Sequence, residues 1–401
     1  MNGERIVIAG ASLAGLRGAR SMREAGFCGD ITVVGAEPHF PPYDRPPLSK
    51  QVLTGQWRPE KAQLRAADDM ALDLRLGQPA ESLNLSGRAV IVGGAPLHFD
   101  GLMIATGAAA RPLPGPAATR LGGVFTLRTL DDCLRLREWL AGTASVAVIG
   151  AGFIGCEVAA SCRALGLHVT LLDALATPME RAIGADLGAV LAGLHSRHGV
   201  RLLLGRPVVG LVGRDEVTGV LLADGGLIEA GAVVVALGAV PQTDWLDGSG
   251  LRVDDGLLCD RNCFALGSDR VVAAGDVARW EHPLLGRAIR VEHWTNAVSQ
   301  AQAAGRNLVA GISGRGEPEA YADVPYFWSD QYDWKLQFAG VADGPAVIEE
   351  GDTGTGRFAA CYRADGRLSG VLCVNWPARF SHYRRAVAEE WRAGTTMRQK
   401  G

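Results

Sequence analysis

Two glycine-rich segments of this chain have the residue spacing that binds the phosphates of a dinucleotide. The central one, Gly150-Ala-Gly152-Phe153-Ile154-Gly155, follows the apolar run 146–149. The first glycine permits a tight turn, the second lets the backbone approach a pyrophosphate, and the third lets helix and strand pack closely. A helical pattern, a second strand at 168–172 and then Asp173 follow. An acid at that point accepts hydrogen bonds from an adenosine ribose, so the segment predicts a dinucleotide site.

The same pattern occurs near the N-terminus. An apolar strand, 5–9, leads into Gly10-Ala-Ser12-Leu-Ala14-Gly15, and a helix, a strand and Glu37 follow. Ser12 stands where the second glycine is expected, so we expect the backbone to approach a phosphate less closely there. Two such units predict two dinucleotides used together, although one unit could be a relic without a ligand.

The internal similarity extends beyond the two turns. Each turn is followed, a little under one hundred residues later, by a strand that ends in glycine, at 102–107 and at 233–238. Hairpin-like segments precede both strands, at 86–94 and 213–226, so the halves read as two copies of one nucleotide-binding fold. A later strand, 271–274, ends in Gly275-Asp276, where an acid can reach a ligand at the carboxyl edge of a parallel sheet.

The remaining chain predicts a different kind of domain. An Ala-rich helix is expected at 297–312 and a linker at 311–318, after which aromatic residues and alternating strand-like runs indicate an antiparallel sheet. A helix rich in Arg, 379–392, follows the sheet. We predict an α/β protein with two Rossmann-like dinucleotide-binding domains and a C-terminal α+β domain. The expected boundaries are 1–112 with 241–316 for the first domain, 113–240 for the second and 317–401 for the third.

Composition and cysteine positions narrow the function. With 401 residues and a net charge of −3, the chain shows no overall preference for nucleic acid. No apolar run reaches the ~18–20 residues that span a bilayer, and no signal peptide is seen, so we expect a cytoplasmic protein. The eight cysteines form no Cys-x-x-Cys, and a metal site is not expected. No cysteine lies between Cys28 and Cys133, so no local thiol can accept electrons after the first unit.

A proline-rich segment, 41–50, ends in Lys50, one of only four lysines, and we expect a helix from Leu48 onward. A positive charge close to the first dinucleotide would stabilise a reduced flavin anion. An ordinary surface lysine is the alternative that the composition leaves open.

Several motifs together resemble one family. They are GASLAG, YDRPPLSK, ATGAAARPLPG, GAGFIGCE, AAGDVA, VEHWTNA and FWSDQYD, in this order along nearly the whole chain. The sequence resembles the flavin-dependent ferredoxin reductases that serve bacterial ring-hydroxylating dioxygenases and haem monooxygenases, within the glutathione reductase-like flavoproteins. The resemblance implies FAD in the first unit, NADH in the second, and an iron–sulfur ferredoxin as the partner that supplies an oxygenase.

The resemblance also implies roles for individual residues. Lys50 pairs with Glu157 beside the flavin, where Trp294 lies against the ring, and these three form the expected catalytic set. The expected FAD-binding residues are Gly10, Ser12, Ala14, Gly15, Glu37, Arg45, Lys50, Ala80, Thr106, Gly107, Arg128, Gly275, Asp276 and Trp294. Those expected for NAD are Gly150, Gly152, Phe153, Ile154, Gly155, Glu157, Asp173 and Gly238.

Further expectations concern specificity and partners. Asp173 would repel a 2′-phosphate, which favours NADH over NADPH, with Arg181 as the one reservation. An acidic ferredoxin would dock on a basic face, for which the candidate arginines are Arg279, Arg287, Arg290, Arg379, Arg384 and Arg385. We expect a monomer or a weak homodimer.

An NADH oxidase or quinone reductase and a flavoprotein like apoptosis-inducing factor are the rival functions. The missing loop cysteine argues against the oxidase, and the absence of insertions and of a targeting segment argues against the last.

Overall fold

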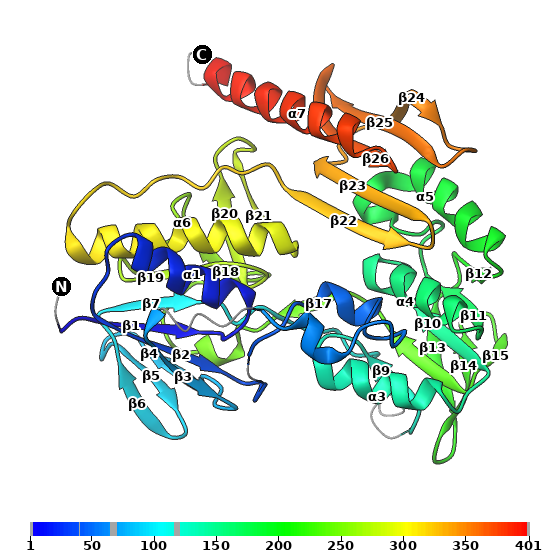
Figure 1. Cartoon of the computed structure of the whole chain (residues 1–401), viewed down its shortest axis with the longest axis horizontal. Coiled ribbons are helices and arrows are strands. Elements are labelled where there is room, and N and C mark those ends of the chain that lie inside the picture. Colours follow the sequence, from blue (N-terminus) through cyan, green and yellow to red (C-terminus); the bar gives the residue numbers. More distant parts are fainter. Residues whose placement is uncertain (1–2, 40, 65–69, 116–120, 399–401) are drawn as a thin grey trace.

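The computed structural model describes residues 3–39, 41–64, 70–115 and 121–398. The first of its two similar halves combines N-terminal residues with residues 271–313. It is built on a parallel sheet in the order β19-β7-β1-β2-β3. The bounds are β1 Arg5–Ala9, β2 Asp30–Gly35, β3 Leu72–Leu76, β7 Gly101–Ile104 and β19 Val271–Ala273. Two helices, α1 (Leu13–Glu24) and α6 (Trp294–Ser313), pack together above this sheet (Figure 1). The central strands are apolar wherever both of their faces are buried, which is all of β7 and all of β1 after the exposed Arg5.

A second parallel sheet repeats this arrangement, in the order β12-β11-β10-β16-β9. The bounds are β9 Val124–Thr126, β10 Ser145–Ile149, β11 His168–Leu172, β12 Arg201–Leu203 and β16 Ala232–Val235. Its helices are α3 (Leu130–Leu140), α4 (Phe153–Ala164) and α5 (Glu180–Arg197). In each sheet the strand before the glycine-rich turn is central, so both turns emerge at the carboxyl edge in the middle of a sheet.

Each half carries a small antiparallel sheet at the predicted hairpin positions. The first comprises β4 (Ser82–Asn84), β5 (Ala89–Val92) and β6 (Ala95–His98), and the second β13 (Val208–Gly213), β14 (Val217–Leu222) and β15 (Leu227–Glu229). The two glycine-ended strands lead to β8 (Ala108–Ala110) and β17 (Ala239–Pro241), which pair with each other. The chain therefore crosses between the halves and returns along one two-stranded ribbon. A third small sheet contains β18 (Leu257–Cys259), β20 (Ala278–His282) and β21 (Arg287–Arg290).

The C-terminal part is an antiparallel sheet in the order β22-β23-β26-β25-β24, with α7 (Pro377–Arg398) against it (Figure 1). The bounds are β22 Tyr326–Gln331, β23 Trp334–Gly340, β24 Ala346–Asp352, β25 Arg357–Ala364 and β26 Arg367–Val374. This sheet contacts the second half, because β22 packs on α4 and β24 on α5. Short 3₁₀ turns occur at η1 (Pro46–Ser49), η2 (Pro59–Ala62) and η4 (Asp244–Leu246).

Two local predictions were wrong. The helix expected from Leu48 onward is the 3₁₀ turn η1 followed by irregular turns, because Lys50 takes a non-helical backbone conformation (φ −127°, ψ −100°). The linker expected at 311–318 begins only at Gly314. Residues 311–313 continue α6, which ends where Gly314 adopts φ +64°, a conformation that favours glycine.

Candidate functional site

The two glycine-rich turns have nearly the same backbone. Gly10 and Gly150 adopt φ +123° and +102°, and a Cβ on either would lie within 2.3 Å of a backbone oxygen at the end of the neighbouring strand. A Cβ on Gly15 would lie 1.9 Å from the Gly10 oxygen, and one on Gly155 would lie 1.8 Å from the Gly150 oxygen. These four glycines are therefore required by packing between strand, turn and helix.

The middle positions of the turns differ in what constrains them. A Cβ on Gly152 would meet no atom of the described residues within 4 Å, so the space beside this glycine is open to a ligand. Ser12, at the matching position, is the N-cap of α1 and its side chain accepts no capping hydrogen bond. Both helix N-termini thus present unused N–H groups beside open space, which fits the pyrophosphate of a dinucleotide.

A single cavity of about 780 Å³ is lined by both turns and by the C-terminal sheet. The predicted residues that line it are Ser12, Ala14, Arg45, Lys50, Thr106, Gly107, Arg128, Gly152, Phe153, Ile154, Glu157, Gly238, Gly275, Asp276 and Trp294. The other predicted residues, Gly10, Gly15, Glu37, Ala80, Gly150, Gly155 and Asp173, lie off its wall. The first turn, the second turn and the acid after β19 therefore converge on one space, although they are more than one hundred residues apart in sequence.

Lys50 and Glu157 form a buried ion pair at this cavity. The Lys50 Nζ lies 2.6 Å from Glu157 Oε2, and the two side chains are 12% and 7% exposed. Ser49 donates to the same carboxylate oxygen at 2.5 Å, and Ser329 of β22 donates to Oε1 at 2.8 Å. Glu157, on α4 of the second half, thus accepts from the first half and from the C-terminal sheet. The two serines were not among the predicted site residues, although each lies inside a motif that carried the family resemblance.

Two arginine–carboxylate pairs connect other predicted FAD-binding residues. Arg128 donates to Asp276 at 2.5 Å and to the Ala108 carbonyl at 2.9 Å. Arg45 donates to Glu37 at 2.6 Å and to the Arg128 carbonyl at 2.6 Å. Tyr43, which sequence reasoning missed, also donates to Glu37, and burial raises the pKa of its hydroxyl well above the usual range. These pairs hold the side chains of one wall in place without a ligand.

The acid after β11 also stabilises the second turn itself. Asp173 accepts hydrogen bonds from the backbone N–H of Ala151 at 2.6 Å and of Leu175 at 2.8 Å. Arg181, the residue that left the choice between NADH and NADPH open, lines the same cavity.

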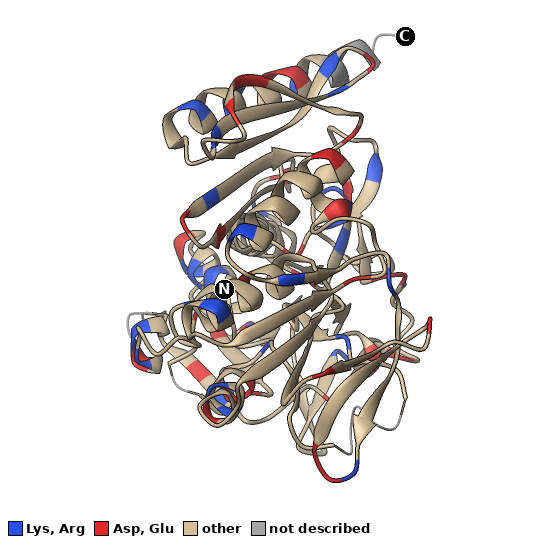
Figure 2. Cartoon of the chain, turned by 90° about the vertical axis from the view of Figure 1, so that its right-hand side faces the viewer, with Lys and Arg blue, Asp and Glu red and all other residues tan. Residues whose placement is uncertain are grey.

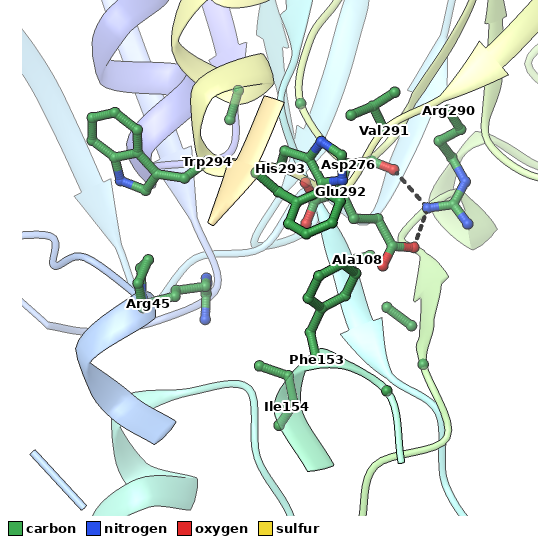
Figure 3. Close-up of a pocket in the computed structure, with 18 of the residues that line it drawn as sticks. Arg45, Ala108, Phe153, Ile154, Asp276, Arg290, Val291, Glu292, His293 and Trp294 are labelled. Atoms are coloured by element: carbon green, nitrogen blue, oxygen red, sulfur yellow. Dashed lines mark hydrogen bonds and ion pairs between the residues drawn. The ribbon is translucent and has the colours of Figure 1, made fainter. Parts of the chain in front are cut away.

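Another part of the cavity wall carries His293 and Glu292, which the sequence did not single out, beside Phe153 and Arg290 (Figure 3). His293 packs edge-on against Phe153 and close to Phe327. Burial lowers the pKa of His293 to about 4, and its Nδ1 has no hydrogen-bond partner among the residues that the structure describes. Arg290 donates to Glu292 at 2.5 Å and to the Asp276 carbonyl at 3.2 Å. A buried nitrogen without a partner at the cavity wall is consistent with a polar ligand there.

Trp294 and Arg45 lie on the other side of the same cavity (Figure 3). The indole N–H of Trp294 donates to Asp44 at 2.9 Å, which fixes the ring. The cavity is therefore bounded by rigid aromatic and paired charged groups on both sides.

Most arginines expected to form a free basic docking face are paired with acids. Arg279 pairs with Asp254, Arg287 with Asp343, Arg290 with Asp255 and Glu292, and Arg379 with Glu350. Arg384 lies over the Tyr326 ring, and Arg385 donates to the Ser381 carbonyl. Both signs of charge are interspersed over the C-terminal sheet and helix (Figure 2). These arginines therefore do not form an uncompensated positive patch.

All eight cysteines lie among the described residues, and each is a free thiol. Only Cys28 is exposed, and burial raises the pKa of the Cys133 and Cys162 thiols to about 12. None lines the cavity. Within the described ranges no group of His, Cys, Asp and Glu is placed to hold a metal ion, and no helix is long and apolar enough to cross a bilayer.

The fold and the two convergent turns define a flavoprotein-type oxidoreductase. Residues 4–301 match the pyridine nucleotide-disulphide oxidoreductase family, and residues 326–396 match the reductase C-terminal family. The chain belongs to the pyridine nucleotide-disulphide oxidoreductases. It is 38% identical to rhodocoxin reductase of Rhodococcus erythropolis, covering 96% of this chain and 90% of the relative. It is 33% identical to putidaredoxin reductase of Pseudomonas putida, covering 96% and 92%.

The solved structures agree with this assignment. The covalent complex of putidaredoxin reductase with putidaredoxin matches with a TM-score of 0.89 at 32% identity, covering 97% of this chain and 94% of that one. These findings confirm the predicted fold class and the resemblance to ferredoxin reductases of oxygenase systems. They also confirm FAD and NADH as the cofactors of the chain.

Proposed function

We propose that this chain passes electrons from NADH through FAD, one at a time, to an iron–sulfur ferredoxin that supplies a haem monooxygenase or a ring-hydroxylating dioxygenase. The observation that carries the proposal is the single cavity lined by both dinucleotide-binding turns, with the Lys50–Glu157 pair between them. No cysteine lines this cavity, so electrons delivered there leave to a partner and not to a thiol of the chain. The resemblance to rhodocoxin and putidaredoxin reductases supports the same direction of transfer.

We assign the two cofactors to the two halves. FAD, when bound, accepts the hydride and passes its electrons on singly, which is chemistry that no side chain supplies. The first turn, Arg45, Arg128 and Asp276 would hold it, and the second turn with Asp173 would hold NADH. This assignment gives the domains predicted above, 1–112 with 241–316 for FAD, 113–240 for NAD and 317–401 as the interface domain.

Lys50 and Glu157 would keep the nicotinamide in register with the acceptor. The two side chains have little conformational freedom, because the pair is buried and Glu157 accepts hydrogen bonds from three donors. Correct orientation of two bound reactants lowers a barrier by several kcal/mol. The chain supplies this geometry and the exclusion of water by the surrounding aromatic wall.

Replacing Glu157 tests that role directly. Glu157→Gln should slow reduction of the bound flavin by NADH at least about tenfold, since the amide no longer neutralises Lys50 or holds it in place. FAD should stay bound, which its visible absorption will show. Glu229→Gln is a suitable control, because this exposed glutamate lies in the same half on β15, away from the cavity. Unchanged reduction in Glu157→Gln would refute the catalytic role.

The preference for NADH is proposed from Asp173, whose carboxylate would repel a 2′-phosphate. The ratio of kcat/KM for NADH and NADPH measures it. A preference for NADPH would contradict the proposal and would point to Arg181, which lines the cavity and could neutralise the phosphate.

The overall function is tested by spectroscopy followed by coupled electron transfer. The purified protein should be yellow, its flavin bands should bleach when NADH is added without oxygen, and cytochrome c reduction should depend on added ferredoxin. A colourless protein that takes up no FAD would overturn the proposal. Equal rates with and without ferredoxin, or efficient reduction of a quinone, would favour the quinone reductase instead.

The proposal places the protein in the cytoplasm, as a monomer or weak homodimer. Because most of the candidate docking arginines are paired with acids, added salt should slow electron transfer to ferredoxin only moderately. A rate that falls steeply with salt would show that the acid partners release the arginines on docking.

A further inference from the structure

A chain of buried polar side chains runs from the C-terminal sheet to Glu157. Ser329 donates to Glu157 at 2.8 Å, and the Gln331 Nε2 lies 3.2 Å from the Ser329 hydroxyl. The Gln331 Oε1 lies 3.1 Å from His195 Nε2, and His195 Nδ1 lies 2.9 Å from the Tyr332 hydroxyl. Glu157, Ser329, Gln331 and His195 are at most 5% exposed. The chain therefore joins α5, β22 and α4 through the interior.

Donor and acceptor rules give this chain one direction. A carboxylate paired with a lysine only accepts, so the single proton of Ser329 points to Glu157. The Ser329 oxygen must then accept from the Gln331 amide nitrogen, which turns the Gln331 oxygen toward His195. That oxygen accepts only, so His195 carries its proton on Nε2 and accepts from Tyr332 on Nδ1. Each donor points along the chain toward Glu157.

The sequence places these groups together for a simple reason. Strand side chains alternate between faces, so Ser329 and Gln331 on β22 both point inward, while Asp330 between them is half-exposed. The second hydrogen of the Gln331 amide is used by the Met179 sulfur at 3.4 Å. Burial lowers the pKa of His195 to about 4, which keeps it neutral near pH 7. The motif FWSDQYD, whose function was open, thus supplies two consecutive members of the chain.

We propose that Ser329, Gln331 and His195 are positioning residues that hold the Glu157 carboxylate in its orientation for the reduction step. The inference rests on the proposed function, because it concerns the same Lys50–Glu157 pair. Lys50 and Ser49 donate to one oxygen of Glu157. Among the described residues, Ser329 is the only donor to its other oxygen. Among the described residues, the C-terminal sheet reaches the Glu157 carboxylate through this serine. The C-terminal sheet then contributes to the geometry of hydride transfer, in addition to its proposed role as an interface domain.

The test uses flavin reduction by NADH in the holoprotein, followed by stopped-flow absorbance. Ser329→Ala should lower the reduction rate at saturating NADH about tenfold, with a much smaller change in the NADH dissociation constant. Gln331→Glu is nearly isosteric but accepts on both sides, so it should draw the Ser329 proton away from Glu157 and give a similar loss. In the double variant the losses should not add, because both changes break the same chain.

Matched controls separate positioning from general damage. Ser369→Ala removes another buried serine hydroxyl bond of the same sheet, and Gln337→Glu changes another amide that bonds a hydroxyl. Both controls should reduce the flavin at the wild-type rate. Urea unfolding of the holoproteins gives a reading apart from activity. The midpoint losses of Ser329→Ala and Glu157→Gln should be less than additive when combined, since the residues are in direct contact.

The outcomes distinguish this inference from the proposed function. A wild-type protein that NADH does not reduce defeats the function itself. If the wild type is reduced and Glu157→Gln is slow, but Ser329→Ala matches the wild type, the positioning role is overturned. Losses that add fully in the double variant would also overturn it. If Gln331→Glu does not fold, Ser329→Ala with His195→Gln tests the same chain, and normal reduction in both would refute it.

Discussion

The two glycine-rich turns show which features of a dinucleotide site are set by the protein and which by the ligand. Gly10 matches Gly150 and Gly15 matches Gly155, with the same close approach to backbone oxygens. At the middle position the turns differ, Ser12 in one and Gly152 in the other, and a Cβ on Gly152 would meet no atom of the described residues within 4 Å. The conserved geometry is therefore imposed by packing, and the variable position faces the open side of the turn.

The acids that follow the turns differ in the same way. Glu37 is held by two side chains, Arg45 and Tyr43, whereas Asp173 is held by backbone N–H groups, that of Ala151 in the glycine-rich turn and that of Leu175. The first acid can change partners when a ligand binds, because side chains can rotate. The second acid is fixed to the backbone of the glycine-rich turn, so it keeps its position whether or not a dinucleotide is present.

The largest expected effect comes from adding a methyl group at the last glycine of either turn. Gly15→Ala or Gly155→Ala would place a Cβ less than 2 Å from a backbone oxygen, so strand and helix must separate. We expect about 3 kcal/mol or more of lost stability. Gly15→Ala should also abolish FAD binding, whereas Gly155→Ala should retain FAD and lose reduction by NADH. Flavin absorbance measures FAD binding and its reduction by NADH, and urea unfolding measures the loss of stability. If Gly155→Ala released FAD and Gly15→Ala did not, the assignment of the halves would be reversed.

The second prediction compares one buried histidine from each half. Burial lowers the pKa of His195 and of His293 to about 4, below the value of 6.5 for an unperturbed histidine. The unfolded chain therefore binds more protons between pH 6.5 and 4, and stability is lost as pH falls through this window. Each group should account for about 3 kcal/mol over the window. His195→Gln or His293→Gln should each flatten the pH dependence of urea unfolding of the holoprotein. An unchanged slope in both variants would contradict the prediction.

The sequence predicted the two repeated halves of the molecule better than the polar contacts that join distant segments. The strands, the turns and the hairpins follow local rules of spacing and apolar pattern, so they could be read from either copy. Ser329 and His195 could not, because their importance comes from contacts with Glu157 and Gln331 that only the folded chain creates. Arg279 and its neighbours read as free cations in sequence, but their acid partners lie on other elements. Non-local pairing of polar groups leaves little local signal.

A smaller effect is expected at the middle of the second turn. Gly152→Ala adds a Cβ that meets no atom in the described part of the chain and needs no unusual φ, so stability should hardly change. The methyl group would nevertheless stand between the helix N-terminus and a pyrophosphate. NADH affinity should fall about tenfold, since a backbone hydrogen bond to a charged group contributes about 1.5–3 kcal/mol. Titration of NADH binding measures this, and unchanged affinity would show that the phosphate lies elsewhere.

The smallest effect is expected from the reciprocal change in the first turn. Ser12→Gly removes a side chain that caps no N–H of α1, so its loss should cost only a few tenths of a kcal/mol. If the serine Cβ limits the approach of the FAD pyrophosphate, the variant should bind FAD slightly more tightly. If the hydroxyl instead donates to a phosphate oxygen, the variant should bind FAD more weakly. The FAD dissociation constant, measured by flavin fluorescence, distinguishes the two. We expect the tighter value, because Gly152 at the matching position of the second turn shows that the fold itself needs no side chain there.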